Sequence, residues 1–314
     1  MMRYSFSTEV VDLDNQAPNR NKRESRYFFD ELNHLICAGG FSGIEIPYEP
    51  KWDFGGRSGI PRTMRSILVK FGSVAAYMDF LKANGIERID CIHMNPSLFC
   101  RGAAPMYFGA FGHFAEEAIE FAAQAGCRTV TLSVTPPVYK IRSLADFESE
   151  EGFLEKTKEV ITALTGKAAG AGVQLCLKNE YWGLLRGERI LAFLDGLGGA
   201  VKLDADTANL YIAVVQPQKF VKEHMDRIGI VHLTDTSFVD NDETWKTALP
   251  EFPAGRATKV YTDPGEGEVD LKAVIKVLKE AGYDGTVVLD PKDSYDISRS
   301  ILRARYFLDT QADR

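Results

Sequence analysis

The chain has 314 residues and a formal charge of −7, from 37 Lys and Arg against 44 Asp and Glu. A hydrophobic share of 45% with 26% charged residues supplies enough apolar material for a large core, which excludes a disordered chain and a small disulfide scaffold. The acidic balance disfavours non-specific nucleic-acid binding, because that binding relies on Lys and Arg contacts to phosphates.

Five scattered cysteines without a CxxC motif indicate reduced thiols, as in a cytoplasmic protein. The first residues, MMRYSFSTEVVDLD, carry charges early and lack the apolar core of a signal peptide. No run approaches the roughly 18 apolar residues of a membrane span. We therefore expect a cytoplasmic location and no membrane partner.

Runs rich in β-formers alternate with amphipathic helical segments along the chain. The predicted strands are residues 4–10, 43–47, 88–94, 128–134, 173–180, 200–206, 229–235 and 286–290. The predicted helices are residues 27–38, 74–84, 114–125, 151–171, 187–197, 217–227, 271–281 and 294–308. A glycine often separates a helix from the next strand, as in QAGCRTVTL and EAGYDGTVVL, because glycine adopts the left-handed conformation that ends a helix.

Eight β–α units predict an α/β fold with a single (β/α)8 TIM barrel over residues 1–314. The runner-up, an open doubly wound sheet, lacks the GxGxxG motif after its first strand. The long irregular stretch at about 236–268 is predicted to be a loop on the catalytic face, where the βα loops of such barrels lie.

Charged and imidazole side chains follow four consecutive predicted strands, at the ends where TIM-barrel chemistry is located. Side chains alternate along a strand, so Lys178 and Glu180 share one face, as do Asp290 and Lys292. A lone Asp at a strand end is more often a helix cap or an ion-pair partner, but charges from four strands around one cavity need pairing or a divalent ion. The residues are Lys178, Asn179, Glu180, Asp204, Asp206, His232, Asp235, Asp290 and Lys292.

Other residues near the predicted cavity suit a polyol. Glu45 on the second strand and His93 at the end of the third are expected to point to the same rim. Trp182, after the fifth strand, either stacks on a sugar face or packs in the core. Trp52 and Arg57 lie in a glycine-containing segment that we expect to form a lid or a subunit contact.

Five segments resemble the xylose isomerase-like TIM-barrel superfamily, which includes sugar isomerases and epimerases, inosose dehydratases and endonuclease IV. The segments are GIEI at 43–46, DTANLY at 206–211, VHLTD at 231–235, the PGEGEVDLKAVIKVL run from 264 and YDGTVVLD at 283–290. Their order and spacing cover nearly the whole chain. The resemblance does not choose among the reactions of the superfamily.

In that family a divalent metal is held by Glu, Asp, His and Glu on strands five to eight, and the two Glu residues also move protons. The resemblance assigns Asp206 and His232 as ligands here, with Asp290 as a shortened Glu. Strand five departs from the pattern, because Lys178 stands where the Glu ligand is expected and Glu180 follows two residues later.

Two accounts of Lys178 remain open. In the first, Glu180 replaces the missing ligand, and one Mn²⁺, Mg²⁺, Zn²⁺ or Co²⁺ sits about 6–7 Å further along the strand with Asp206, His232 and Asp290. In the second, the ammonium of Lys178 takes the cation's place and pairs with Asp206 and Asp290. The site is then metal-free, since an ammonium repels a dication.

The first functional hypothesis is a sugar isomerase or epimerase that abstracts a proton next to a carbonyl and passes through an enediolate. Glu180 or Asp290 would move protons, and Lys178 or a metal would stabilise the oxyanion. The alternative is a lyase or dehydratase on a keto-sugar or keto-inositol, including C-glycoside cleavage beside a smaller partner subunit, and it begins with the same proton abstraction. The predicted substrate-binding residues are Glu45, His93, Trp182, Asn209 and Lys292.

Two other functions come from different classes of protein. The departures from the family pattern at Lys178, Asn209 and Asp290 also suit a non-catalytic sugar-binding barrel. An AP endonuclease is disfavoured by the charge of −7 and by Asn209 in place of an expected His. Because such barrels often pair, a homo-oligomer is expected.

Overall fold

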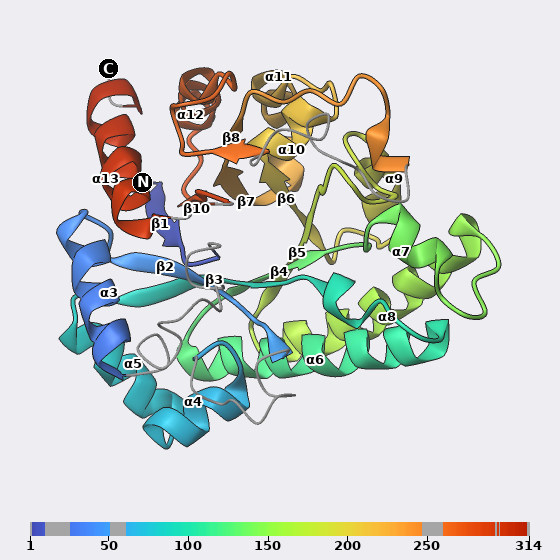
Figure 1. The fold of residues 1–314 in the computed structure, drawn as a ribbon, viewed down its shortest axis with the longest axis horizontal. Coiled ribbons are helices and arrows are strands. Elements are labelled where there is room, and N and C mark those ends of the chain that lie inside the picture. Colours follow the sequence, from blue (N-terminus) through green and yellow to red (C-terminus); the bar gives the residue numbers. More distant parts are fainter. Residues whose placement is uncertain are drawn as a thin grey trace.

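The computed structural model of the protein describes residues 2–9, 26–50, 61–246, 260–292, 294 and 296–312. Within these ranges eight parallel strands close into a barrel in the order β1-β10-β7-β6-β5-β4-β3-β2 (Figure 1). The predicted (β/α)8 barrel is confirmed. The barrel strands are β1 (Arg3–Ser7), β2 (Gly43–Pro47), β3 (Arg88–Met94), β4 (Thr129–Ser133), β5 (Gln174–Lys178), β6 (Lys202–Asp206), β7 (Ile228–Leu233) and β10 (Thr286–Leu289).

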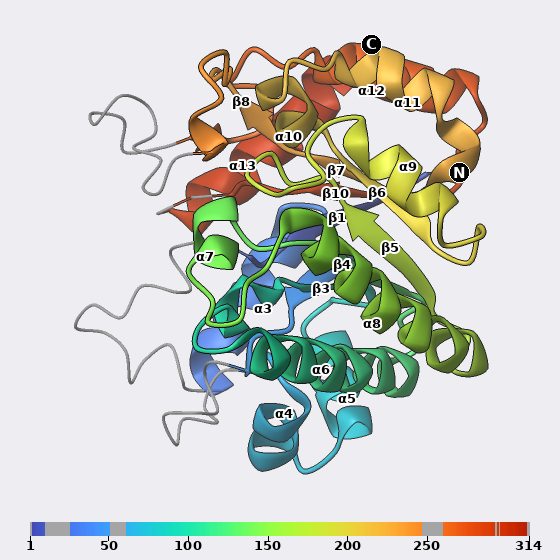
Figure 2. The ribbon, with the colours of Figure 1, turned by 90° about the vertical axis from the view of Figure 1, so that its right-hand side faces the viewer.

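Helices surround the strands in both ribbon views (Figures 1 and 2). The α-helices are α3 (Arg26–Ala38), α4 (Met64–Phe71), α5 (Val74–Ala83), α6 (Ala104–Ala125), α7 (Val138–Arg142), α8 (Glu150–Gly170), α9 (Arg189–Asp195), α10 (Thr207–Ile212), α11 (Pro217–Glu223), α12 (Leu271–Glu280) and α13 (Ile297–Phe307). The short 3-10 and π turns are η2 (Pro96–Phe99), η3 (Met225–Arg227), η4 (Thr244–Lys246) and η5 (Leu308–Ala312). None of the helices in the described ranges combines the length and the apolar character that a membrane span needs.

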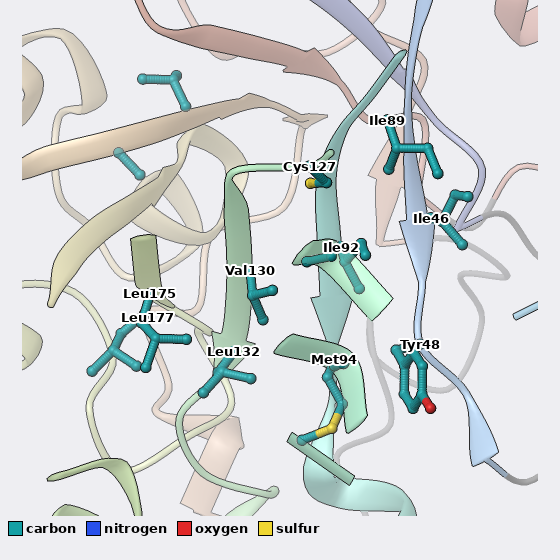
Figure 3. Packing of buried hydrophobic residues seen from close by; sticks show 14 of the residues in the cluster. Ile46, Tyr48, Ile89, Ile92, Met94, Cys127, Val130, Leu132, Leu175 and Leu177 are labelled. Atoms are coloured by element: carbon teal, nitrogen blue, oxygen red, sulfur yellow. The ribbon is translucent and has the colours of Figure 1, made fainter. Parts of the chain in front are cut away.

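The outer faces of the strands pack against these helices. Neighbouring strands place their apolar side chains in register, so that they form rows across the sheet (Figure 3). One row is Ile92, Val130 and Leu175, and the next is Met94, Leu132 and Leu177. This continuous apolar layer holds the strand ends in fixed positions.

Inside the barrel, a small apolar cluster lies below a polar layer. The cluster consists of Cys91, Cys176, Ile230 and Val288. Because side chains alternate along a strand, the residues two positions further on, Lys178, His232 and Asp290, also face the interior. Strand register places Lys178 beside Asp204, and Asp206 beside His232. The sheet geometry thus gathers charged residues at the carboxyl ends of four strands.

Helix α6 is longer than predicted. It begins at Ala104 instead of residue 114, because the buried stripe of Tyr107, Phe111 and Ala115 continues the helical period across Gly109 and Gly112.

Strand β5 is shorter than predicted and ends at Lys178 instead of residue 180. Asn179 turns its side chain onto β6, where its Nδ2 donates to the Asp206 carbonyl at 3.2 Å and its Oδ1 accepts from the Asp206 amide at 2.8 Å. Glu180 therefore lies beyond the strand, and strand alternation does not set its direction.

The predicted loop at about 236–268 contains a two-stranded antiparallel ribbon. Strand β8 (Asp235–Thr236) pairs with β9 (Tyr261–Thr262). Residues 247–259 of this loop lie outside the described residues, as do Trp52 and Arg57.

Candidate active site

The carboxyl-terminal mouth of the barrel holds two lysines and two aspartates in one group. Lys178 Nζ lies 3.5 Å from Asp206 Oδ2 and 3.5 Å from Asp290 Oδ2. Lys292 Nζ donates to Asp206 Oδ2 at 2.8 Å and lies 3.8 Å from Asp290 Oδ2. The side chains of Lys178, Asp206 and Asp290 are fully buried, whereas that of Lys292 is 12% exposed. Lys292 is therefore the member of this group that reaches solvent.

Hydrogen-bonding capacity remains open in this group. Among the described residues, Lys178 Nζ and both carboxyl oxygens of Asp290 have no hydrogen-bond partner, although all three atoms are buried. The ion pair between them balances charge at 3.5 Å, which is longer than an ordinary hydrogen bond. Buried polar atoms normally find a partner, so these atoms have unused hydrogen-bonding capacity.

The pKa values of Asp290 and Asp206 are shifted in opposite directions. Burial raises the pKa of Asp290 to about 6, against the lowering effect of Lys178 and Lys292. Burial acts on Asp206 too, but the two lysines outweigh it and hold the pKa of Asp206 below its usual range. Burial and Lys292 oppose the charge of Lys178, yet the surrounding aspartates keep its pKa above the ordinary value. Asp290 is thus the carboxyl group of this cluster that can exchange a proton near neutral pH.

A chain of hydrogen bonds centred on His232 crosses the barrel interior. His232 Nδ1 lies 2.6 Å from Asp204 Oδ1, and His232 Nε2 lies 2.6 Å from Glu45 Oε2. Ser7 Oγ donates to Glu45 at 2.8 Å, and Thr131 Oγ1 donates to Asp204 at 2.6 Å. Burial opposes the charge of the ring, but Asp204 and Glu45 prevail and raise the pKa of His232 to about 10. The ring is therefore protonated on both nitrogens at neutral pH.

A second hydrogen-bonded chain runs along the rim of the mouth. Glu9 Oε2 lies 2.5 Å from His93 Nδ1, and His93 Nε2 lies 3.0 Å from Ser133 Oγ. Ser133 Oγ donates to Glu180 Oε1 at 2.6 Å, and Asn209 Nδ2 donates to Glu180 Oε2 at 2.9 Å. A cavity of about 220 Å³ adjoins the first two members of this chain. It is lined by Glu9, Pro47, Tyr48, Glu49, His93, Asn95, Ser97 and Leu98.

Two predicted substrate-binding residues, Glu45 and Trp182, contact other parts of the protein. The Glu45 carboxylate is held in the interior by His232, whereas His93 bonds Glu9 and Ser133, so the shared rim of Glu45 and His93 stays a prediction. Trp182 is half-buried and packs against the apolar cluster that contains Tyr181 and Tyr261, which corresponds to the packing alternative.

The sequence reasoning missed Glu9, Ser133 and Tyr261. Ser133 ends β4, and Glu9 follows the end of β1, so the strand-end rule applied to strands five to eight also covers these two positions. Tyr261 carried no such signal, because the β8–β9 ribbon brings it to the site. Its hydroxyl donates to Asn209 Oδ1 at 2.9 Å, and Lys292 Nζ lies 5.1 Å from its ring centroid.

The predicted metal ligands are not brought together as a set. Within the described ranges, one ligand atom each from Glu45, His232 and Asp290 lie within 4.8 Å of one another. Two predicted ligands, Glu180 and Asp206, are absent from this group: Glu180 is held on the rim beyond the end of β5, and Asp206 is bound by Lys292. Acidic and imidazole donors thus do converge, but with Glu45 in place of Glu180 and Asp206.

These residues do not fit a divalent ion in the arrangement that they adopt. Lys178 places a buried ammonium between Asp206 and Asp290. His232 offers no lone pair, because carboxylate oxygens face both of its nitrogens and a metal-binding imidazole must be neutral.

A closed barrel of eight parallel strands with polar residues at their carboxyl ends is a TIM barrel. Enzymes with this fold have their active sites at that end. The chain belongs to the xylose isomerase-like TIM barrel family, whose model matches residues 36–309.

Two curated relatives are named inosose dehydratase. The protein from Lacticaseibacillus casei is 31% identical over 113 residues, which are 35% of this chain and 37% of that protein. The protein from Serratia proteamaculans is 25% identical over 193 residues, which are 59% of this chain and 64% of that protein. In these matches the chain spans less than two thirds of the relatives' own length.

Two solved structures share the fold over nearly all of both chains. The probable 3-DHS dehydratase of petrobactin synthesis from Bacillus anthracis has a TM-score of 0.67 and 13% identity, and the match covers 99% of this chain and 100% of that one. The D-psicose 3-epimerase from Clostridium cellulolyticum H10 has a TM-score of 0.64 and 13% identity, with coverage of 99% and 98%. These relatives and structural neighbours are all named as enzymes, and they include both dehydratases and an epimerase.

Proposed function

We propose that the protein is a lyase that removes water from a keto-polyol, either an inosose or a keto-sugar. The observation that carries the proposal is the open hydrogen-bonding capacity of Lys178 and Asp290, two oppositely charged, fully buried groups at the barrel mouth. A substrate with oxygen atoms on adjacent carbons suits both groups, because a carbonyl oxygen accepts from Lys178 and a hydroxyl donates to Asp290. The name of the curated relatives, inosose dehydratase, supports this substrate class.

Asp290 is the proposed base. A pKa of about 6 leaves its carboxyl group mostly ionised at neutral pH and still able to accept a proton, as removal of a C–H proton next to a carbonyl requires. The ammonium of Lys178 would donate to the carbonyl oxygen and stabilise the negative charge that develops there.

The rim chain is the proposed source of the second proton. Elimination is complete when the hydroxyl group on the next carbon leaves with a proton as water. His93 is linked to Glu180 through Ser133, and Glu9 outweighs burial in raising the pKa of His93. After the elimination, Asp290 holds the proton taken from carbon, and the rim chain has given one proton to the leaving hydroxyl group. The products are water and an unsaturated ketone.

An isomerase or epimerase is the second candidate, and Glu180 supports it. An epimerase needs proton-transfer groups on opposite faces of one carbon. Lys178 stands at the strand-five position where the family has a carboxylate. Glu180, on the rim, is the carboxylate that remains for proton transfer on the second face. The loss of the strand-five carboxylate favours elimination over epimerisation.

The test is incubation of the full chain with an inosose and with keto-hexoses in heavy water, followed by mass spectrometry and NMR. A lyase yields a product that has lost one water. An isomer of unchanged composition with deuterium on the reacting carbon would instead establish the second candidate. If neither product nor deuterium exchange appears while a ligand binds, the protein is a non-catalytic sugar-binding barrel and the proposal fails.

A further inference from the structure

A cation that bridges two buried carboxylates is already built into the chain. Lys178 Nζ lies at the same distance, 3.5 Å, from Asp206 Oδ2 and from Asp290 Oδ2, and its side chain is 0% exposed. These two aspartates come from β6 and from the end of β10, which are the positions that the family resemblance gives to metal ligands. The ammonium therefore occupies the space between two carboxylates that a metal ion would otherwise share.

The imidazole that would complete a metal site is also engaged. His232 Nδ1 and Nε2 each lie 2.6 Å from a carboxylate oxygen, of Asp204 and of Glu45. Ionised carboxylates only accept hydrogen bonds, so both ring nitrogens must donate and the ring is an imidazolium. No nitrogen lone pair is left for a metal.

The charges in the interior match this arrangement. Glu45, Asp204, Asp206 and Asp290 are four buried acids around one space. Lys178 and the additional ring proton of His232 bring two positive charges to them, which is the charge of one divalent ion. Lys292, which pairs with Asp206, adds a third positive charge, so the protein's own cations balance most of the charge of the four acids, as buried charges need.

We propose that this barrel works without a metal ion, and that Lys178 together with protonated His232 takes the place of the divalent cation of its family. The proposal concerns the cation alone and holds whichever reaction the site catalyses. Its consequence is that one substitution restores the missing ligand. Lys178→Glu removes the ammonium and returns a carboxylate to strand five, next to Asp206 and Asp290.

The test measures binding of Mn²⁺ alone to the full chain, by titration monitored by electron paramagnetic resonance and by elemental analysis after purification without added metal. We expect the wild type to carry no metal and to show no Mn²⁺-dependent rise in melting temperature. Lys178→Glu should bind about one Mn²⁺ per chain, at least about 100-fold more tightly than the wild type.

A matched control separates site formation from a change in net charge. Lys202→Glu makes the same charge change on β6, but Lys202 lies at the opposite, amino-terminal end of that strand, where its ammonium donates to the Asp226 carbonyl. This variant should bind Mn²⁺ as poorly as the wild type. Lys178→Gln, which removes the charge without adding a carboxylate, should show intermediate affinity and serves if Lys178→Glu does not fold.

Two results would overturn the proposal. One is wild-type protein that purifies with about one equivalent of a divalent metal or is stabilised by Mn²⁺. The other is a folded Lys178→Glu or Lys178→Gln variant with no gain in Mn²⁺ affinity. Neither result depends on turnover, so failure of the proposed lyase activity would be seen separately.

Discussion

At the scale of single residues, the proposed chemistry depends on two side chains. Lys178 and Asp290 face each other across 3.5 Å without a hydrogen bond, and both are fully buried. Such a pair is costly to bury unless something else satisfies its polar atoms. In the proposed function, a ligand with adjacent oxygen atoms would supply those contacts.

Asp290→Asn tests the proposed base, because it removes the ionisable group and keeps its size. We expect kcat to fall about 10²- to 10⁴-fold, the usual contribution of acid–base catalysis. The matched control is Asp284→Asn, an exposed aspartate just before β10, which should leave kcat unchanged. Steady-state kinetics and thermal melting of both variants decide the outcome. Equal activity in the two variants would remove Asp290 from the mechanism.

Short connections fix the site at the scale of secondary-structure elements. Asp206 ends β6, and its Oδ1 accepts from the Asn209 amide at 2.9 Å, so the same carboxylate caps α10 and binds Lys292 through Oδ2. In the loop after β7, Asp235 accepts from the amides of Gly265, Gly267 and Val269. A Cβ at Gly267 would lie only 2.3 Å from Asp235 Oδ1, so this close approach requires glycine.

Asn179→Ala tests the connection between β5 and β6. The substitution removes both hydrogen bonds to the Asp206 backbone, and we expect it to lower the free energy of unfolding by about 1–3 kcal/mol. It should also reduce kcat/KM, because Asp206 and Lys178 lose their fixed spacing. Urea unfolding and steady-state kinetics measure the two effects.

The control for this variant is Asn84→Ala. Asn84 is also buried, and its Nδ2 donates to the Phe80 carbonyl at 2.8 Å at the end of α5, on the outside of the barrel. A similar loss of stability with full activity is expected there. If Asn179→Ala kept full kcat/KM as well, the connection would be structural only.

Buried charge affects stability at the scale of the whole molecule. The ordinary pKa of His232 is 6.5, and its two carboxylate partners raise the folded-state pKa to about 10 despite burial. A group whose pKa is raised by folding contributes stability that is fully present below its unfolded pKa and is lost as pH rises through the folded value. The relevant window therefore runs from pH 6.5 to about 10.

We expect the urea midpoint of the wild type to fall as pH rises from 7 to 10. His232→Gln should have a lower urea midpoint at pH 7. Its midpoint should change less with pH over that range, because the variant has no imidazole ring that loses a proton there. His113→Gln, with a ring that is 63% exposed, should keep the wild-type slope. An unchanged slope in His232→Gln would contradict the assignment of the ring proton.

Local signals in the sequence were sufficient to predict the fold. Hydrophobic periodicity and the glycines between helices and strands are local signals, and they located eight barrel strands in the right order. They also indicated which residues lie at the carboxyl ends of β5, β6, β7 and β10, including the unusual Lys178. Local signals did not predict that Glu180 lies beyond β5, because the end of this strand is set by hydrogen bonds of Asn179 to β6.

How those residues combine depends on contacts that form when the barrel closes. Glu45 and His232 are 187 positions apart in the chain and lie 2.6 Å apart in the barrel, and no local pattern encodes that distance. Protonation of His232 and the placement of the Lys178 ammonium between two aspartates both follow from distances between strands. The physical reason is that strand alternation depends on neighbours in sequence, whereas charge compensation depends on the residues that barrel closure brings together.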